Sequence, residues 1–156
     1  MKEKLTFEQT KEKALRLLEF RSHSEAELRE KLFRAGGTDI DNVIAFCYEY
    51  NFLNDREYAK KLARDLVNLK AYGKRRVYLE LKSKGIESEF IDEAIEELSE
   101  VDIREKLFPL VEKRLGGNVD KKNTDKVIRY FAYRGYEIDD IKSCIDEVKR
   151  RIEYGI

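Results

Sequence analysis

The spacing of apolar residues repeats three times along the chain. Each copy has two apolar positions four residues apart, and a glycine follows the second after four more residues. Apolar residues four apart share one face of an α-helix, and glycine supplies the left-handed conformation that often ends a helix. The copies are Leu28, Leu32 and Gly36; Val77, Leu81 and Gly85; and Val127, Phe131 and Gly135. The pattern predicts a repeated unit of helix, tight turn and helix.

Helix-start signals place further helices around these turns. Thr6 and Ser24 are each followed three residues later by Gln or Glu, which is the spacing of a capping box. Asn54 has Glu57 at the same spacing. The predicted capping residues are Thr6, Ser24, Thr38, Asn54, Asp102, which has Glu105 three residues later, and either Asn123 or Thr124. Each signal precedes an apolar stripe with helical period, so helices are predicted throughout the chain.

The fold class follows from these patterns. No segment shows sustained alternation of apolar and polar residues, so no β-sheet is predicted. A unit of about 50 residues is marginally stable alone, and neighbouring units are therefore expected to share buried surface. The sequence predicts an all-α protein of three tandem three-helix, helix-turn-helix-like repeats, at residues 1–53, 54–100 and 101–156, in an elongated, curved array.

Side chains for catalysis or metal binding are sparse. His23 is the one histidine and lies beside a predicted cap, where a structural role is favoured. Cys47 and Cys144 fall on inward helical faces, as small core residues do. Phosphate-binding glycine loops and metalloprotease motifs do not occur. We therefore predict no enzyme activity, no catalytic residue, no metal and no cofactor.

The cellular compartment follows from what the sequence contains. The chain has two cysteines and no secretory signal pattern. It also has no apolar run near the ~20 residues that a membrane span needs. These features predict a soluble, cytoplasmic protein with no membrane partner, and we expect a monomer.

Charge is distributed unevenly although 32 basic residues balance 32 acidic ones. From residue 56 to residue 85 there are ten bases and three acids, whereas residues 86–102 hold eight acids and no base. One interpretation is that both runs are solvated helix faces. The other is that the basic run forms a patch for phosphates or for an acidic protein surface. The two interpretations are compatible.

Sequence-specific DNA reading is disfavoured in the middle repeat. In a helix-turn-helix module the last helix enters the major groove. Here that helix would be SEFIDEAIEELSE, whose carboxylates the DNA phosphates would repel. Any nucleic-acid contact is therefore expected from the first two helices of that repeat, through the backbone and without sequence preference.

The chain resembles the RecX family of bacterial recombination regulators over nearly its whole length. The R-x-x-S-x-x-E-L-x-x-K-L pattern is met by Arg21, Ser24, Glu27, Leu28, Lys31 and Leu32. The leucine-acid-acid, aromatic-alanine signature is Leu53, Asn54, Asp55, Tyr58 and Ala59, with asparagine replacing the first acid. The G-x-x-R-[IV]-x-x-E-L-x-x-K-G-I pattern is met by Gly73, Arg76, Val77, Glu80, Leu81, Lys84, Gly85 and Ile86. The R-G-[FY] pattern is Arg134, Gly135 and Tyr136.

This resemblance implies a modulator of the RecA recombinase. RecX-like proteins bind RecA, especially its filament on single-stranded DNA, and restrict filament growth or promote its loss. Strand exchange, RecA ATPase activity and co-protease activity are thereby lowered, which bears on homologous recombination, DNA repair and the SOS response. The partners implied are RecA and its nucleoprotein filament, with direct contact to single- or double-stranded DNA left open.

The candidate contact residues come from the basic run. The predicted RecA- or DNA-contacting patch is Arg56, Lys60, Arg64, Tyr72, Lys74, Arg75, Arg76, Tyr78, Lys82 and Lys84. The acidic stretch from Glu87 to Glu100 is expected to face basic protein surface or solvent. Two alternatives remain open, namely a sequence-independent DNA-binding protein that acts without RecA and a general helical adaptor for other proteins.

Overall fold

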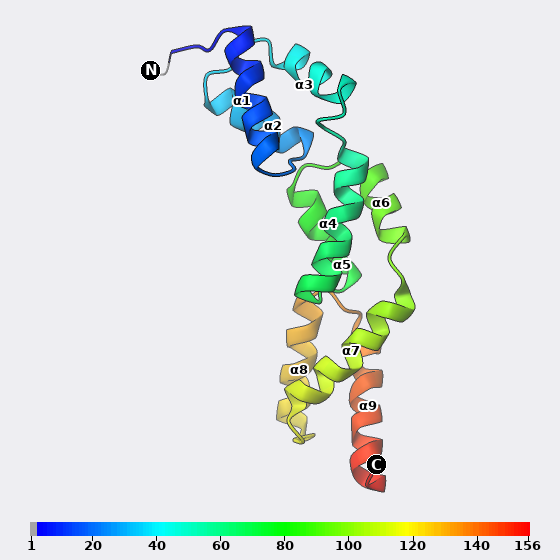
Figure 1. Ribbon diagram of the computed structural model, residues 1–156. Helices are drawn as coiled ribbons and strands as arrows, with labels where there is room; N and C mark the ends of the chain where they lie inside the picture. The colour runs from blue at the N-terminus through cyan, green and yellow to red at the C-terminus, as the bar shows by residue number, and fades with distance from the viewer. Residues whose placement is uncertain (1–2) are drawn as a thin grey trace. The chain divides into compact units, whose positions relative to one another are not determined.

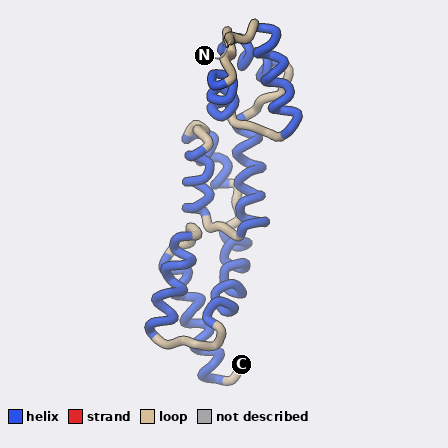
Figure 2. Tube along the Cα trace, turned by 90° about the vertical axis from the view of Figure 1, so that its left-hand side faces the viewer, coloured by secondary structure: helices blue, strands red, loops and turns tan. Residues whose placement is uncertain are grey.

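All the regular secondary structure of the described residues is helical. The computed structural model describes residues 3–156, with the backbone alone at residues 100–102, and over this range it has nine helices and no strand. Figure 2 shows only helices and loops there. The helices (Figure 1) are α1 Phe7–Phe20, α2 Glu25–Arg34, α3 Ile40–Glu49, α4 Asp55–Lys70, α5 Lys74–Ser83, α6 Ser88–Glu96, α7 Glu100–Leu115, α8 Lys121–Tyr133 and α9 Ile138–Tyr154. The predicted all-α fold class is confirmed.

The repeated positions behave as the apolar pattern predicts. All six apolar residues of the repeat are buried, with at most 2% of their surface exposed. The three repeat glycines have positive φ, at 81° for Gly36, 73° for Gly85 and 102° for Gly135. Each of these glycines directly follows the end of a helix, namely α2, α5 or α8. Glycine is favoured there because it adopts a positive φ at little cost.

The chain divides into two compact units. Unit 1 is Met1–Leu62 with Leu81–Ala94, and unit 2 is Ala63–Glu80 with Ile95–Ile156. The helices of the middle predicted repeat therefore contribute residues to both units. The predicted boundaries of three separate repeats stay a prediction.

Unit 1 is built around helices α1, α2 and α3. Its core joins Ala14 of α1, Leu28 and Leu32 of α2, and Val43 and Cys47 of α3. The predicted capping boxes are present at the first two helices: the side chains of Thr6 and Ser24 accept hydrogen bonds from backbone N–H groups three residues later. Each such cap stabilises its helix by about 1 kcal/mol.

Three predicted caps were wrong. Position 102 cannot cap the start of α7, because that helix already begins at Glu100. Thr38 does not cap α3. Its hydroxyl donates to the Leu5 carbonyl at 2.7 Å, and the residue at the N-cap position of α3 is Asp39. Helix α8 is capped by Asp120, whose carboxylate accepts the Asn123 N–H at 2.8 Å. Asn54 does accept the Glu57 N–H, at 3.2 Å. The errors arose where a tertiary contact or an earlier residue took the capping role.

The start of α2 is joined to two other segments of unit 1. The Ser24 hydroxyl donates to the Lys84 carbonyl at 2.6 Å, and the buried Asp55 carboxylate accepts the Glu25 N–H at 2.8 Å. Gly85 lies against Ala26, because a Cβ at Gly85 would come within 2.5 Å of the Ala26 Cβ. The capping turn of α2 is therefore also the contact to the first turn of α4 and to the turn after α5.

In unit 2, the segment between α4 and α5 lies directly on the turn between α8 and α9. The Gly73 N–H donates to the Arg134 carbonyl at 2.9 Å, and the Arg75 N–H donates to the Gly135 carbonyl at 3.2 Å. The Tyr136 hydroxyl donates to the Ala71 carbonyl at 2.7 Å. A Cβ at Gly135 would lie 2.3 Å from the Arg76 backbone nitrogen. The two turns can therefore approach this closely only because residue 135 is a glycine.

We predict that Gly135→Ala destabilises the protein more than Gly117→Ala does. Both glycines have positive φ, at 102° and 79°, but a Cβ at Gly117 would have no atom within 4 Å. The control should lose about 1 kcal/mol to backbone strain. Gly135→Ala should lose about 1–3 kcal/mol beyond that, because the methyl group must displace backbone. Urea unfolding followed by circular dichroism measures both, and equal losses would contradict the close contact.

We predict opposite effects for two substitutions of Asp55. Burial, followed by the nearby charges of Glu25 and Glu87, raises the pKa of Asp55 above its ordinary value of 3.8. A carboxyl with a higher pKa in the folded state costs stability once the pH exceeds both values, and costs nothing below the unfolded value. Asp55→Asn keeps an oxygen for the Glu25 N–H, so it should stabilise the protein near neutral pH and lose that advantage toward pH 4.

Asp55→Ala is the matched comparison. It removes the same charge but leaves the Glu25 N–H without its acceptor, so we expect a loss of about 1–3 kcal/mol. Urea unfolding of the three proteins as a function of pH measures the difference. If Asp55→Asn is as destabilising as Asp55→Ala at neutral pH, the charge and not the hydrogen bond is what the site requires.

Candidate functional site

The ten residues of the predicted patch are divided between the two units. Unit 1 holds Arg56, Lys60, Lys82 and Lys84, whereas unit 2 holds Arg64, Tyr72, Lys74, Arg75, Arg76 and Tyr78.

In unit 1, carboxylates neutralise part of the basic run. The Arg56 guanidinium pairs with Glu93 at 2.9 Å and lies 5.0 Å from the centre of the Phe90 ring. The Lys84 ammonium lies 3.6 Å from Glu27. Burial opposes ionisation of Glu27, but the Ser24 N–H and the Lys84 charge outweigh it and lower the pKa of Glu27. Lys60 and Lys82 also interact with neighbouring groups. This group supports the interpretation of mutually compensating charges.

In unit 2, two of the predicted residues meet side chains from distant parts of the sequence. The Arg76 guanidinium lies 5.1 Å from the centre of the Tyr72 ring and 5.0 Å from that of Tyr133. Its Nε also pairs with Glu80 at 2.9 Å. A hydrogen bond with Tyr133, followed by the bond to Glu80, raises the pKa of Arg76. Arg76 therefore remains a cation that is held against aromatic rings.

The same alternation of cation and ring continues beyond the predicted patch. Arg134 lies 5.0 Å from the centre of Tyr72 and 5.7 Å from that of Tyr130, and Arg114 lies 3.5 Å from the centre of Tyr130. We call this set the arginine-tyrosine row; its members are Tyr133, Arg76, Tyr72, Arg134, Tyr130 and Arg114. Guanidinium groups favour the faces of aromatic rings, so each side chain orients its neighbour.

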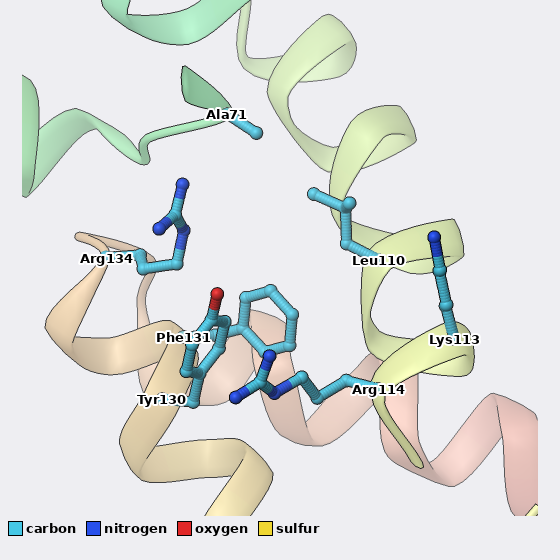
Figure 3. A pocket seen from close by; sticks show the side chains of 7 residues that line it. All are labelled: Ala71, Leu110, Lys113, Arg114, Tyr130, Phe131 and Arg134. Atoms are coloured by element: carbon cyan, nitrogen blue, oxygen red, sulfur yellow. The ribbon is translucent and has the colours of Figure 1, made fainter. Parts of the chain in front are cut away.

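Two hollows border the row. One has a volume of about 480 Å³ and an apolar wall of Ala71, Leu110 and Phe131. Figure 3 shows that Arg114 of α7 and Arg134, which directly follows α8, both reach this hollow, with the Tyr130 ring near both. The second hollow, also about 480 Å³, is bordered by Tyr133 and by the cations Lys126 and Arg129. Arg114 and Tyr130 line both hollows, so the two are adjacent.

The remaining predicted residues of unit 2 lie outside the row. Arg64 and Arg75 are exposed, and Tyr78 is half-buried. Lys74 lines a smaller hollow of about 180 Å³ together with Arg104, Glu137 and Asp140. The mixed charge of that hollow makes it a poorer site for phosphate than the hollows along the row.

Sequence reasoning missed four members of the row as contact residues. Arg114, Tyr130, Tyr133 and Arg134 lie outside the basic run on which the predicted patch was based. A signal was present, because residues 129–136 read RYFAYRGY and place tyrosines and arginines at helical spacing. The pairing of this stretch with Tyr72 and Arg76 depends on the tertiary contact between the two turns.

Burial accounts for the shifted pKa values of the histidine and of the two cysteines. Burial lowers the pKa of His23, whose ring nitrogens lie 2.9 Å from the Arg21 carbonyl and 2.9 Å from the Lys31 ammonium. Burial also raises the pKa of the Cys47 and Cys144 thiols. Among the side chains that the structure describes, no three histidines, cysteines or carboxylates are placed to hold a metal ion. Within residues 3–156, no helix has the length and apolar character needed to cross a membrane.

The fold and the site define an all-helical protein whose most distinctive surface is rich in arginine and tyrosine. The family model for the first three-helix domain of RecX matches residues 11–47, and the model for the second matches residues 54–95. Two curated relatives, both called regulatory protein RecX, come from Vibrio campbellii and Clostridioides difficile. They are 38% and 34% identical to this chain, over 87% and 94% of its length and 89% and 71% of their own.

Two solved structures share the fold of this chain. The crystal structure of RecX from Lactobacillus salivarius matches with a TM-score of 0.82 and 22% identity, over 92% of this chain and 96% of that one. A second crystal structure, of regulatory protein RecX, matches with a TM-score of 0.74 and 18% identity, over 88% and 74%. The chain belongs to the RecX family. The family comprises regulatory proteins and not enzymes, as the sequence predicts.

Proposed function

We propose that this protein regulates recombination and DNA repair by binding the RecA recombinase and its filament on single-stranded DNA. Binding inhibits filament extension, RecA ATPase activity and strand exchange. The observation that carries the proposal is family membership, since relatives called regulatory protein RecX match 87% or more of the chain at 34–38% identity. The motif resemblance to RecX implies RecA as the partner.

We further infer that the cations around the start of α5 contact DNA phosphate or an acidic RecA surface in that assembly. Lys74 and Arg75 are the first two residues of α5, and Arg75 is exposed. Exposed cations release counterions when they meet phosphates, which favours binding without sequence preference. Helix α6 carries carboxylates and is expected to face basic protein surface or solvent.

A second candidate function is sequence-independent DNA binding without RecA. The arginine-tyrosine row of unit 2 favours it, because such a surface could hold nucleic acid by itself. The two candidates differ in whether RecA changes the affinity. A salt titration of binding to bare single-stranded DNA and to RecA-coated DNA separates them, because a RecA regulator prefers the coated strand.

We predict that this protein lowers RecA ATPase activity on single-stranded DNA. ATP hydrolysis is measured while the protein is added from far below one copy per RecA up to equimolar amounts. Strong inhibition at the lowest ratios is expected if it acts at growing filament ends, since one molecule then stops many RecA additions. Unchanged hydrolysis at equimolar protein would refute the proposed function.

We predict that Lys74→Glu combined with Arg75→Glu weakens RecA inhibition, because two attractive charges become repulsive toward phosphate. The half-inhibitory concentration should rise by about tenfold or more, as expected when several phosphate contacts are lost. Lys142→Glu with Lys149→Glu is the matched control, since it makes the same change of charge at exposed positions of α9. If the two double variants inhibit RecA equally well, the patch is wrongly assigned.

A further inference from the structure

We propose that the arginine-tyrosine row of unit 2 is a binding surface for single-stranded nucleic acid. Bases stack on the exposed ring and guanidinium faces, while neighbouring cations hold the phosphates. The inference deepens the proposed function and rests on it only for biological context, because the binding itself requires no recombinase.

The charge of this surface is the first reason. The row contributes Arg76, Arg114 and Arg134, and Lys126 and Arg129 border the second hollow. Arg76 pairs with Glu80, but no carboxylate among the described residues pairs with Arg114 or Arg134. Arg134 instead donates to the Lys70 carbonyl. Positive charge on this surface therefore stays available to phosphate.

The planar groups are the second reason. Arg114 is exposed, and its guanidinium lies only 3.5 Å from the centre of the Tyr130 ring, so its plane is held on one side. Tyr133 is 76% exposed, with Arg76 near its ring. Nucleic-acid bases stack on tyrosine rings and on arginine planes, and this stacking tolerates any base. The row therefore offers stacking positions that are already ordered before a ligand arrives.

The two adjacent hollows are the third reason. Each has a volume of about 480 Å³, and they share Arg114 and Tyr130 as a common border. Volumes of this size accommodate small organic groups such as a nucleobase. Two hollows in succession, separated by a planar pair, suit consecutive nucleotides of one strand.

A single strand fits these features better than the other polyanions. Duplex DNA keeps its bases paired and stacked, so it would meet the cations but not the exposed Tyr133 ring or the hollows. An acidic peptide would likewise use the charges and leave the planar groups without a matching surface. Single-stranded nucleic acid uses both, since unstacked bases are free to leave the strand.

The test is fluorescence anisotropy of a labelled oligothymidylate of about 20 nucleotides, without RecA, at several salt concentrations. The double variant Tyr133→Ala with Arg114→Ala should bind at least about tenfold more weakly than the unmodified protein, since each lost stacking position alone reduces affinity severalfold or more. Both side chains are exposed, so the fold should persist, and urea unfolding checks this. The control Tyr154→Ala with Arg150→Ala removes one exposed tyrosine and one exposed arginine from α9 and should bind normally.

Arg114→Lys separates stacking from charge. It keeps the positive charge and loses the plane, so affinity should fall while the salt dependence stays nearly unchanged. Equal losses in the row variant and the α9 control would overturn the proposal. Competition by duplex DNA or by a polyglutamate peptide as effective as that by the unlabelled oligothymidylate would overturn it too, because the surface would then recognise charge alone.

The outcome is distinguishable from failure of the proposed function. If the protein inhibits RecA but does not bind the oligothymidylate, the regulatory role survives and this inference falls. If it binds the oligothymidylate through the row but leaves RecA ATPase unchanged, the inference survives and the regulatory role falls. The same row variant serves in both assays.

Discussion

A backbone contact in unit 2 positions the side chains that give this protein its most distinctive surface. The turn before α5 and the turn after α8 touch through Gly73 and Gly135, where hydrogen bonds of 2.9 and 3.2 Å join the two segments. Because neither glycine has a Cβ, the backbones approach closely enough for Arg134 to reach Tyr72. A larger residue at either position would separate the two halves of the arginine-tyrosine row.

The glycine that ends a helix in each repeat has a second role as a contact point. A Cβ at Gly36 would lie 2.8 Å from the Glu3 carbonyl oxygen, one at Gly85 would lie 2.5 Å from the Ala26 Cβ, and one at Gly135 would lie 2.3 Å from the Arg76 nitrogen. A different segment therefore packs on each turn. Helix termination and tertiary packing impose the same residue, which is a physical reason for the glycine in every copy of the pattern.

Two basic residues of unit 1 and two arginines of unit 2 have different kinds of partner. In unit 1, Arg56 and Lys84 are held by carboxylates, which satisfy their charge. In unit 2, Arg114 and Arg134 lie on tyrosine rings, which orient a guanidinium without neutralising it. Charge that is oriented but not neutralised remains able to attract a phosphate or a carboxylate of a partner. This contrast explains why a count of basic residues alone did not locate the surface.

The sequence by itself determined the all-helical fold, the buried face of each repeat, the glycine turns and the RecX resemblance, because helical period and capping act over only a few residues. It did not determine which distant side chains meet. Two helix caps illustrate this limit. The Thr38 hydroxyl bonds the distant Leu5 carbonyl and does not cap α3, and Asp120 caps α8 in place of the residues that the sequence predicted. Only the tertiary structure brought Tyr72 and Arg76 beside Tyr133 and Arg134, because their contact crosses some 60 residues of chain through two turns whose pairing no local pattern encodes.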